Sequence, residues 1–386
     1  MTDSGNHRIT ERVAASERSA IRVMFDMAEA HDGELVRLEV GEPDFDTPEH
    51  VTEAAFEAAR SGETHYTSNA GMPELREAIA AGREGRTAED VVVTTGGMEA
   101  LHLAMLTVAE SGSEVVIPAP SWPNYAVQAR LADATPIEVG LPEEEGFALD
   151  PETMIDAMTE ETSVVVLTSP SNPTGRVFEP EAVREVAAAA AEHDAYVIAD
   201  EVYRGLVYEG ADRAMASYVD DPERVLTVDS CSKRYAMTGW RIGWLSGPTP
   251  VIDEVTKIHE ATTACASSVA QHAALAAIEG PQEPVERMYE AFRERREYVV
   301  ERIGSIPNVS AAPPEGAFYA FLDVGALPGD TLSIAKRLLR EHGVVTAPGN
   351  GFGEAGAGYL RVSFANDLPR LERGFDGIEA MVREEV

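Results

Sequence analysis

The sequence predicts an α/β fold with a mainly parallel sheet, and two features of the chain indicate this class. The apolar runs at residues 163–168 and 195–199 are nearly continuous, as is typical of strands buried on both faces. A helix-like segment at residues 180–193 separates them, so the three segments make a β-α-β unit whose strands pair in parallel. Further buried strands are expected at residues 90–95, 114–118 and 224–228.

Segments on either side of this sheet predict further strands and helices. Residues 35–40 alternate between apolar and polar, which predicts a strand. Thr47 before Pro48 predicts an N-cap and the first turn of a helix, which Gly62 ends. Two more strands are expected at residues 315–323 and 358–364.

Length, charge and cysteine content limit the classes of protein. At 386 residues, the chain is long for one core and suits two domains. Its 67 acidic and 31 basic residues give a net charge of −36, which argues against nucleic acid or an anionic membrane as a partner. No membrane span and no secretory leader stand out. Two cysteines without metal-ligand spacing suit a reduced, cytoplasmic protein without a metal site.

The acidic excess is combined with a scarcity of lysine: the 31 basic residues are 28 arginines and three lysines. Proteins of salt-loving organisms replace surface lysines with carboxylates, so we interpret the composition as adaptation to high salt. An ordinary acidic protein is the alternative. Either way, an anionic ligand would enter against a negative field and would need fixed cations at its site.

Lys233 is the starting point for the functional interpretation. Lys257 and Lys336 lie in charged, helix-like segments, where an exposed face explains them. Lys233 instead lies in a loop between the apolar runs at residues 224–228 and 240–245. A lysine amine can form a Schiff base with an aldehyde, and an arginine guanidinium cannot. The alternative is an ordinary surface lysine in a loop.

A glycine pair, Gly96 and Gly97, ends the strand at residues 90–95 and opens a helix at residues 98–109. Free backbone N–H groups at Gly97 and Met98, with the positive end of the helix dipole, predict an anion site. The third glycine of a dinucleotide fingerprint is missing, which argues against nicotinamide binding. A tight turn without a ligand is the alternative.

Polar and aromatic residues follow several of the predicted parallel strands. Trp122, Asn172, Asp200 and Lys233 each lie just beyond a strand. The carboxyl ends of parallel strands share one edge of a sheet, which is where α/β proteins bind ligands. Taken singly, three of these residues could have purely structural roles: Trp122 in the core, Asn172 in a turn and Asp200 as a helix cap.

The spacing of Ser230, Lys233 and Arg241, which is S-x-x-K-x(7)-R and closes with Thr-Gly-Trp-Arg, resembles the lysine segment of class I pyridoxal-phosphate aminotransferases. The resemblance extends over residues 35–365. It implies the fold of that family, which has a large domain with a mainly parallel seven-stranded sheet and a smaller α/β domain.

The resemblance also sets the expected boundaries of these domains. The large domain would cover residues 46–283, and the smaller one would combine residues 1–45 with residues 284–386. The same family pattern implies cis peptide bonds before Pro120 and Pro173.

The resemblance assigns a cofactor, pyridoxal 5′-phosphate, and a role to each residue around it. Lys233 would form the Schiff base and later move the substrate proton. Asp200 would pair with the pyridine nitrogen, Asn172 and Tyr203 would hold the ring hydroxyl, and Trp122 would stack on the ring. The phosphate would be held by Gly97, Met98, Ser230 and Arg241.

The substrate would be held by a further set of residues. Arg361 interrupts the apolar strand 358–364 and would bind the α-carboxylate, unless it is an edge-strand arginine facing solvent. Gly41 would bring its backbone close to the substrate, next to Trp122 and Asn172. In the family, a tyrosine at the position of Tyr66 reaches the cofactor phosphate of the neighbouring subunit, which implies a homodimer. A loop aromatic that only packs is the alternative.

The expected activity is amino transfer from an aspartate-like donor to a 2-oxo acid such as 2-oxoglutarate. A dicarboxylate needs a second cation, and His102 is the only basic residue of the helix after the glycine turn. Arg18 and Arg22 are the remaining candidates. Rival functions are an aminotransferase for alanine or aromatic amino acids, a carbon-sulfur lyase on the same fold, and a non-enzymatic cofactor-binding regulator, which would carry a DNA-binding domain and a basic face.

Overall fold

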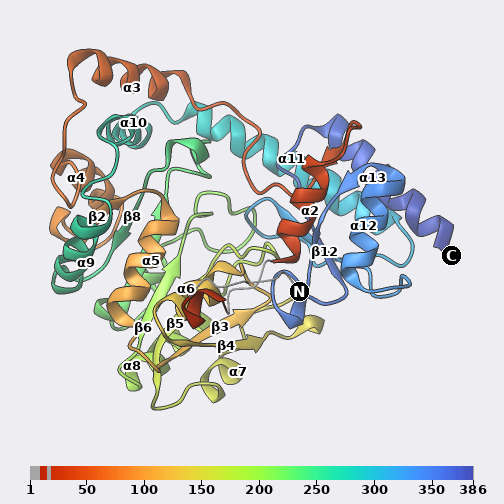
Figure 1. The fold of residues 1–386 in the computed structure, drawn as a ribbon, viewed down its shortest axis with the longest axis horizontal. Helices are drawn as coiled ribbons and strands as arrows, with labels where there is room; N and C mark the ends of the chain where they lie inside the picture. The colour runs from red at the N-terminus through yellow and green to blue at the C-terminus, as the bar shows by residue number, and fades with distance from the viewer. Residues whose placement is uncertain (1–8, 15–18, 386) are drawn as a thin grey trace.

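The computed structural model describes residues 9–14 and 19–385, and its largest sheet has seven strands (Figure 1). The strands are β2 (Val91–Thr94), β3 (Glu114–Ala119), β4 (Thr135–Gly140), β5 (Thr162–Thr168), β6 (Tyr196–Asp200), β7 (Val225–Ser230) and β8 (Gly243–Ser246). Their order is β2-β8-β7-β6-β5-β3-β4. Among these seven strands, β8 alone runs in the opposite direction to the others. The predicted fold class is therefore confirmed.

Helices cover both faces of this sheet, which explains why its strands are nearly continuous in apolar residues. Along β5, Val164 and Val166 pack into one core, and Val165 and Leu167 pack into another on the opposite face. The first core includes α5 (Gly97–Val108), α6 (Asn124–Leu131) and α9 (Thr249–Thr262), and the second includes α7 (Pro151–Asp156) and α8 (Pro180–Glu192).

A second body of structure is built from both ends of the chain. Its antiparallel sheet has the order β11-β12-β9, and a parallel pair joins β1 to β10. Figure 1 shows its helices in blue beside the red α2, on the side away from the seven-stranded sheet. The elements are α2 (Ala20–Glu29), β1 (Val36–Arg37), α11 (Glu283–Ser305), β9 (Tyr319–Asp323), α12 (Thr331–His342), β10 (Val344–Val345), β11 (Ala347–Pro348), β12 (Tyr359–Ser363) and α13 (Leu368–Glu385).

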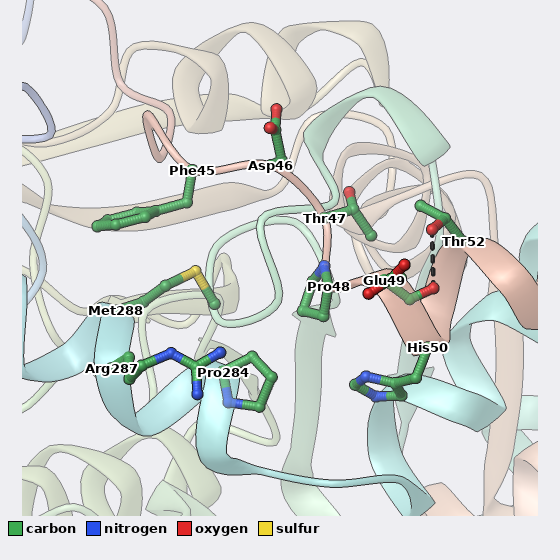
Figure 2. Close-up of a pocket in the computed structure, with 10 residues that line it drawn as sticks. All are labelled: Phe45, Asp46, Thr47, Pro48, Glu49, His50, Thr52, Pro284, Arg287 and Met288. Atoms are coloured by element: carbon green, nitrogen blue, oxygen red, sulfur yellow. Dashed lines mark hydrogen bonds between the residues drawn. The ribbon is translucent and has the colours of Figure 1, made fainter.

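Three further helices form a row beside β2: α4 (Pro73–Ala81) contacts the strand, α10 (Ser268–Glu279) packs against α4, and α3 (Glu49–Ser61) packs against α10. The start of α3 faces the start of α11 across a surface hollow. Figure 2 shows Phe45 and Thr47 on one side of it and Pro284 and Arg287 on the other. The two chain crossings expected between the domains, at residues 45–46 and 283–284, therefore lie at one place, although the domain boundaries themselves stay a prediction.

The structure differs from the sequence prediction at the start of α3. The helix begins at Glu49, and its N-cap position is occupied by Pro48, so Thr47 does not cap it. The Thr47 hydroxyl instead donates to Ala236 O at 2.6 Å and accepts from Trp240 Nε1 at 3.0 Å. These tertiary partners replace the local cap and tie the segment before α3 to the loop after Lys233.

The other local expectations concern one strand, the cis peptide bonds and membrane spans. The strand expected at residues 35–40 is only two residues long, and it pairs with β10, which has the same length. Cis peptide bonds precede Pro120 and Pro173, as expected, and a third precedes Pro170. Among the described residues, the helices are too short or too polar to cross a membrane.

Candidate active site

Lys233 lies in the loop that follows β7, and its side chain turns inward. The Nζ donates a hydrogen bond to Gly41 O at 2.6 Å. Burial lowers the pKa of the Lys233 amine to about 8; the carboxylate of Glu42 opposes the shift, and Arg361 and Arg241 add to it. Lys233 is thus not an ordinary surface lysine. About a tenth of it is the neutral, nucleophilic amine at pH 7, far more than for a free lysine.

Asp200 ends β6 and is 3% exposed. Tyr125 Oη donates to Asp200 Oδ2 at 2.7 Å, and the backbone N–H of Val202 donates to Oδ1 at 3.2 Å. Thr168 Oγ1 in turn donates to Tyr125 Oη at 2.7 Å. Burial raises the pKa of Asp200 to about 6, and the hydrogen bonds from Tyr125 and Val202 oppose this shift. The carboxylate does not cap a helix, because a turn follows β6.

Tyr203, in the turn after β6, meets Tyr319, the first residue of β9 in the second body of structure. Their hydroxyl oxygens are 2.7 Å apart, and both rings are buried. Lys233 Nζ lies 6.0 Å from the ring centroid of Tyr203. Burial raises the pKa of the Tyr203 hydroxyl well above its usual value, so this group stays protonated.

Arg361 lies in β12, the middle strand of its sheet, and is 5% exposed, so it is not an arginine facing solvent. Its Nη1 donates to Asn172 Oδ1 at 2.9 Å, and its Nη2 donates to Glu39 O at 2.5 Å. Its Nε is buried and has no hydrogen-bond partner among the described residues. The guanidinium lies 4.4 Å from the ring centroid of Tyr319. A buried cation with an unused donor is suited to bind an anion.

The glycine turn and Arg241 meet at the start of α5. Gly96 has φ +81°, and a Cβ atom there would lie 2.6 Å from Arg241 Nη2, so the turn leaves room for the guanidinium only because it has no side chain. Gly97 begins α5 and lies close to Ser230, since a Cβ at Gly97 would be 3.8 Å from Ser230 Cβ. The first N–H groups of the helix, including that of Met98, have no partner within it.

The remaining predicted residues lie as follows. Trp122 is partly buried, follows β3 and meets Tyr125 edge to face, with ring centroids 5.5 Å apart. Gly41 lies against Tyr319, whose hydroxyl oxygen would be 2.3 Å from a Cβ, so a side chain is excluded by the protein itself. Tyr66 projects from the surface and is 88% exposed.

The structure brings together most of the predicted site, but within its described ranges it leaves the second cation without a candidate in place. Arg18 lies outside the described residues. Arg22 pairs with Asp26 at 2.8 Å on an exposed side of α2. His102 is engaged by Gln128 Oε1, 2.7 Å from its Nδ1.

The sequence analysis assigns no role in the site to two residues that the structure places there. Tyr125 and Tyr319 stand in segments with the pattern of a core, and aromatic residues in such segments carry no sign of a polar partner. The only signal for Tyr125 is its place three residues after Trp122, in the first turn of the helix that follows the same loop.

Comparisons with known proteins agree with this geometry. The sequence profile for "Aminotransferase class I and II" matches residues 33–376. The aspartate aminotransferase of Pyrococcus horikoshii is 35% identical over 393 residues, which cover 100% of both chains. The solved aspartate aminotransferase from Thermus thermophilus with maleate matches with a TM-score of 0.92 and 38% identity, covering 97% of this chain and 100% of that one. The alanine aminotransferase from Pyrococcus furiosus matches with a TM-score of 0.93 and 31% identity, covering 98% and 100%.

Proposed function

We propose, from the premise that this chain belongs to the class I and II aminotransferases, that the residues around Lys233 hold pyridoxal phosphate and transfer an amino group from an amino acid to a 2-oxo acid. Members of this family generally use that cofactor. The observation that carries the proposal is the Lys233 amine, whose pKa of about 8 lies below that of a free lysine, in the same site as the buried Asp200 and Arg361.

The residues present fit both the ring nitrogen and the phosphate of the cofactor. Asp200 offers a buried carboxylate, stabilised by Tyr125, to a ring nitrogen. The start of α5, with Ser230 and Arg241, offers N–H groups, a hydroxyl and a cation to a phosphate. Bound there, pyridoxal phosphate would supply an aldehyde for the amino group and a ring that accepts electrons.

The protein side chains would then perform the proton transfers and the positioning. Lys233, neutral in part near pH 7, would take the proton from the substrate α-carbon and return it. Asp200 in its charged form would hold a proton on the ring nitrogen. Tyr203 and Asn172 would hydrogen-bond the ring hydroxyl, and Trp122 would lie against the ring face.

Arg361 would bind the α-carboxylate of the substrate. Its Nη1 and Nη2 are held by Asn172 and by Glu39 O, which fixes the guanidinium plane. The Nε, which lacks a partner among the described residues, supports a role in ligand binding, because a buried donor without an acceptor is costly. Gly41 would line the same space.

A homodimer is part of the proposal. Tyr66 is 88% exposed in the single chain, and a large exposed aromatic side chain on an ordered loop suits contact with another subunit. We infer that Tyr66 reaches the cofactor phosphate of the partner.

The preferred donor is proposed to be aspartate, with 2-oxoglutarate as the acceptor. This choice rests on the similarity to aspartate aminotransferases over the whole chain. The engagement of Arg22 with Asp26 weakens the case for it as the second cation, and the similarity to an alanine aminotransferase keeps small or aromatic donors as the second candidate.

Labelling tests the covalent role of Lys233. Borohydride reduction of the holoenzyme followed by peptide mapping should place the pyridoxyl group on Lys233, and Lys233→Ala should fold without taking the label. A label on Lys257 or Lys336 would contradict the assignment.

Single half-reactions test the substrate. Holoenzyme is mixed with one amino acid at a time, and conversion of the cofactor to its amine form is followed by absorbance. Fast reaction with aspartate and glutamate, weakened by Arg18→Ala or Arg22→Ala but not by Arg130→Ala on α6, supports the aspartate donor. Faster reaction with alanine or phenylalanine would replace that donor and keep the aminotransferase. Cofactor release or oxo-acid production without amino transfer would favour a lyase.

A further inference from the structure

A buried histidine and a carboxylate meet directly behind the glycine turn. Glu99 lies in the first turn of α5, and His259 lies in the last turn of α9, which packs against α5 (Figure 1). His259 is completely buried, and its Nε2 lies 3.5 Å from Glu99 Oε2. The roles proposed above use neither residue.

Glu99 holds the turn that leads into α5. Its Oε2 accepts a hydrogen bond from the backbone N–H of Thr95 at 2.5 Å, and Thr95 immediately precedes the glycine pair. Its Oε1 accepts from the hydroxyl of Thr263, just beyond α9. The carboxylate therefore joins the proposed phosphate site to the end of α9.

The partners of His259 indicate that its ring carries a charge. Nδ1 lies 2.7 Å from Asn69 O, and because a carbonyl oxygen only accepts, Nδ1 must be protonated. Nε2 faces the Glu99 carboxylate and has no other partner in the described part of the chain, so a second proton is needed to satisfy it. An imidazolium meets both demands. Although burial opposes it, the interaction with Glu99 raises the pKa of His259, and hydrogen bonds from His259, Thr263 and Thr95 likewise overcome burial and lower the pKa of Glu99 to about 2.

The carbonyl that His259 holds belongs to the segment that presents Tyr66. Asn69 is fixed a second time, because its Nδ2 donates to Ala264 O at 2.8 Å. Gln271 holds both ends of the same segment: its Oε1 accepts from Met72 N at 2.7 Å, and its Nε2 donates to Thr67 Oγ1 at 2.9 Å. Tyr66 is thus an exposed side chain next to a segment, residues 67–72, that hydrogen bonds hold to the rest of the protein.

One continuous path of contacts results. It runs from the glycine turn through Thr95 to Glu99, then to His259, then to Asn69 and the exposed Tyr66. We propose that Glu99 and His259 are a pair of positioning residues that couples the phosphate-binding turn to the segment presenting Tyr66, so that cofactor binding and subunit association strengthen each other. This inference rests on the proposed function, which supplies the phosphate at one end and the partner subunit at the other.

The coupling is reciprocal and can be measured from one side. If association strengthens cofactor binding by some factor, the cofactor strengthens association by the same factor. The dimer dissociation constant is therefore measured by sedimentation for the apoenzyme and for enzyme saturated with pyridoxal phosphate. The ratio of the two constants is the coupling factor.

Glu99→Gln is the central variant, because glutamine keeps the shape and can still accept from Thr95 N but carries no charge. We expect it to lower the coupling factor at least about fivefold. Glu53→Gln, on the exposed face of α3, removes an equal charge elsewhere and should leave the factor unchanged. Thr263→Val removes one hydrogen bond to Glu99 but keeps the ion pair, and it should also leave the factor unchanged. Glu99→Gln should add nothing in a Tyr66→Phe background.

The wild-type protein provides a second measurement that needs no variant to fold. The titratable group that faces His259 is Glu99 on α5, and the segment before α4 contributes the neutral Asn69 carbonyl on the other side. The wild-type coupling factor should fall as the pH rises and His259 loses its proton, whereas the factor of Glu99→Gln should stay flat.

The outcomes separate the two proposals. A lower melting temperature for Glu99→Gln with an unchanged coupling factor would show that the pair only stabilises the fold, and it would overturn the inference. Wild-type protein that binds pyridoxal phosphate only as a monomer would overturn the coupling and the proposed homodimer, whereas wild-type protein that does not bind it would remove the proposed function and the coupling with it.

Discussion

The chemistry of the site depends on how burial changes a few single residues. Burial raises the pKa of Asp200 to about 6 and lowers the pKa of Lys233 to about 8, so the two pKa values approach each other. For Lys233 the shift makes the free amine more available. For Asp200 the shift favours the neutral carboxyl over the charged carboxylate that the site needs. The hydrogen bond from Tyr125, which favours the carboxylate, is therefore important.

Tyr125→Phe tests this hydrogen bond. The Tyr125 hydroxyl donates to the charged form of Asp200 and so lowers the pKa of the carboxyl; its removal should raise that pKa. A hydrogen bond to a charged group contributes about 1.5–3 kcal/mol, which corresponds to about one to two pH units. The acid limb of the kcat/KM profile should therefore move to higher pH, with activity at pH 6 falling more than activity at pH 8.

Thr168→Val is the matched control for this prediction. It removes the hydroxyl that donates to Tyr125 Oη but leaves the bond to Asp200. We expect a smaller shift of the acid limb. A wild-type acid limb in Tyr125→Phe would mean that Asp200 keeps its charge by other contacts.

At this scale the sequence draws attention to residues whose type is out of place. Lys233 stood out because lysine is scarce, and Arg361 stood out because it interrupts an apolar strand. Tyr125 and Tyr319 were missed because a tyrosine looks the same in sequence whether its hydroxyl meets water or a buried carboxylate. Thr47 was given a local role, and its partners Ala236 and Trp240 lie almost 200 residues away in sequence.

The element that carries the proposed phosphate site is the turn between β2 and α5. Its geometry was predictable, since two glycines between a strand and a helix predict a tight turn with free N–H groups. The placement of Arg241 over Gly96 has no such local signal, because Arg241 is distant in sequence and lies just before β8, the strand next to β2; only the family resemblance assigned it to the phosphate. The order β2-β8-β7 brings the three segments together.

Gly96→Ala tests this turn. At φ +81° and ψ 167°, a region that essentially only glycine occupies, an alanine costs about 1–3 kcal/mol of stability, and its Cβ would collide with Arg241 Nη2. Displacing the guanidinium should raise the dissociation constant for pyridoxal phosphate at least about tenfold, since a charge-assisted hydrogen bond contributes about 1.5–3 kcal/mol. Absorbance titration of the apoenzyme measures this constant.

Gly112→Ala separates backbone strain from the collision. Gly112 has φ +84°, and a Cβ there would meet none of the described atoms within 4 Å. Both variants should lose stability in urea, but only Gly96→Ala should bind the cofactor more weakly. Equal affinities in the two variants would remove Arg241 from the phosphate site.

At the scale of the whole molecule, the parallel pairing within the large sheet followed from the sequence, whereas its strand order and the joining of the two bodies of structure did not. The β-α-β pattern predicted parallel strands with covered faces. The pairing of β1 with β10 involves residues more than 300 positions apart, and two-residue strands leave almost no pattern. The hollow of Figure 2, where both crossings of the chain lie, is likewise lined by segments that are far apart in sequence.

The net charge of −36 predicts that salt stabilises the whole molecule. If each of the 31 basic residues neutralises one of the 67 acidic residues, 36 carboxylates remain, and they repel one another in the compact fold. Raising KCl from 0.1 M to 1 M shortens the Debye length from about 10 Å to about 3 Å and weakens this repulsion. At about 2.1 cal/mol/K of unfolding entropy per residue, a gain of about 2 kcal/mol in a chain of 386 residues would raise the melting temperature by about 2–3 °C, as measured by calorimetry at pH 7.5.

A pH series identifies the cause of that gain. Near the sequence pI of about 4.5 the carboxylates are partly protonated and the net charge is small, so KCl should have little effect on the melting temperature there. Stabilisation by general exclusion of salt from the surface would persist at this pH. A melting temperature at pH 7.5 that does not rise with KCl would show that the acidic surface is not adapted to high salt, and that the arginine-carboxylate pairs already neutralise it where the repulsion counts.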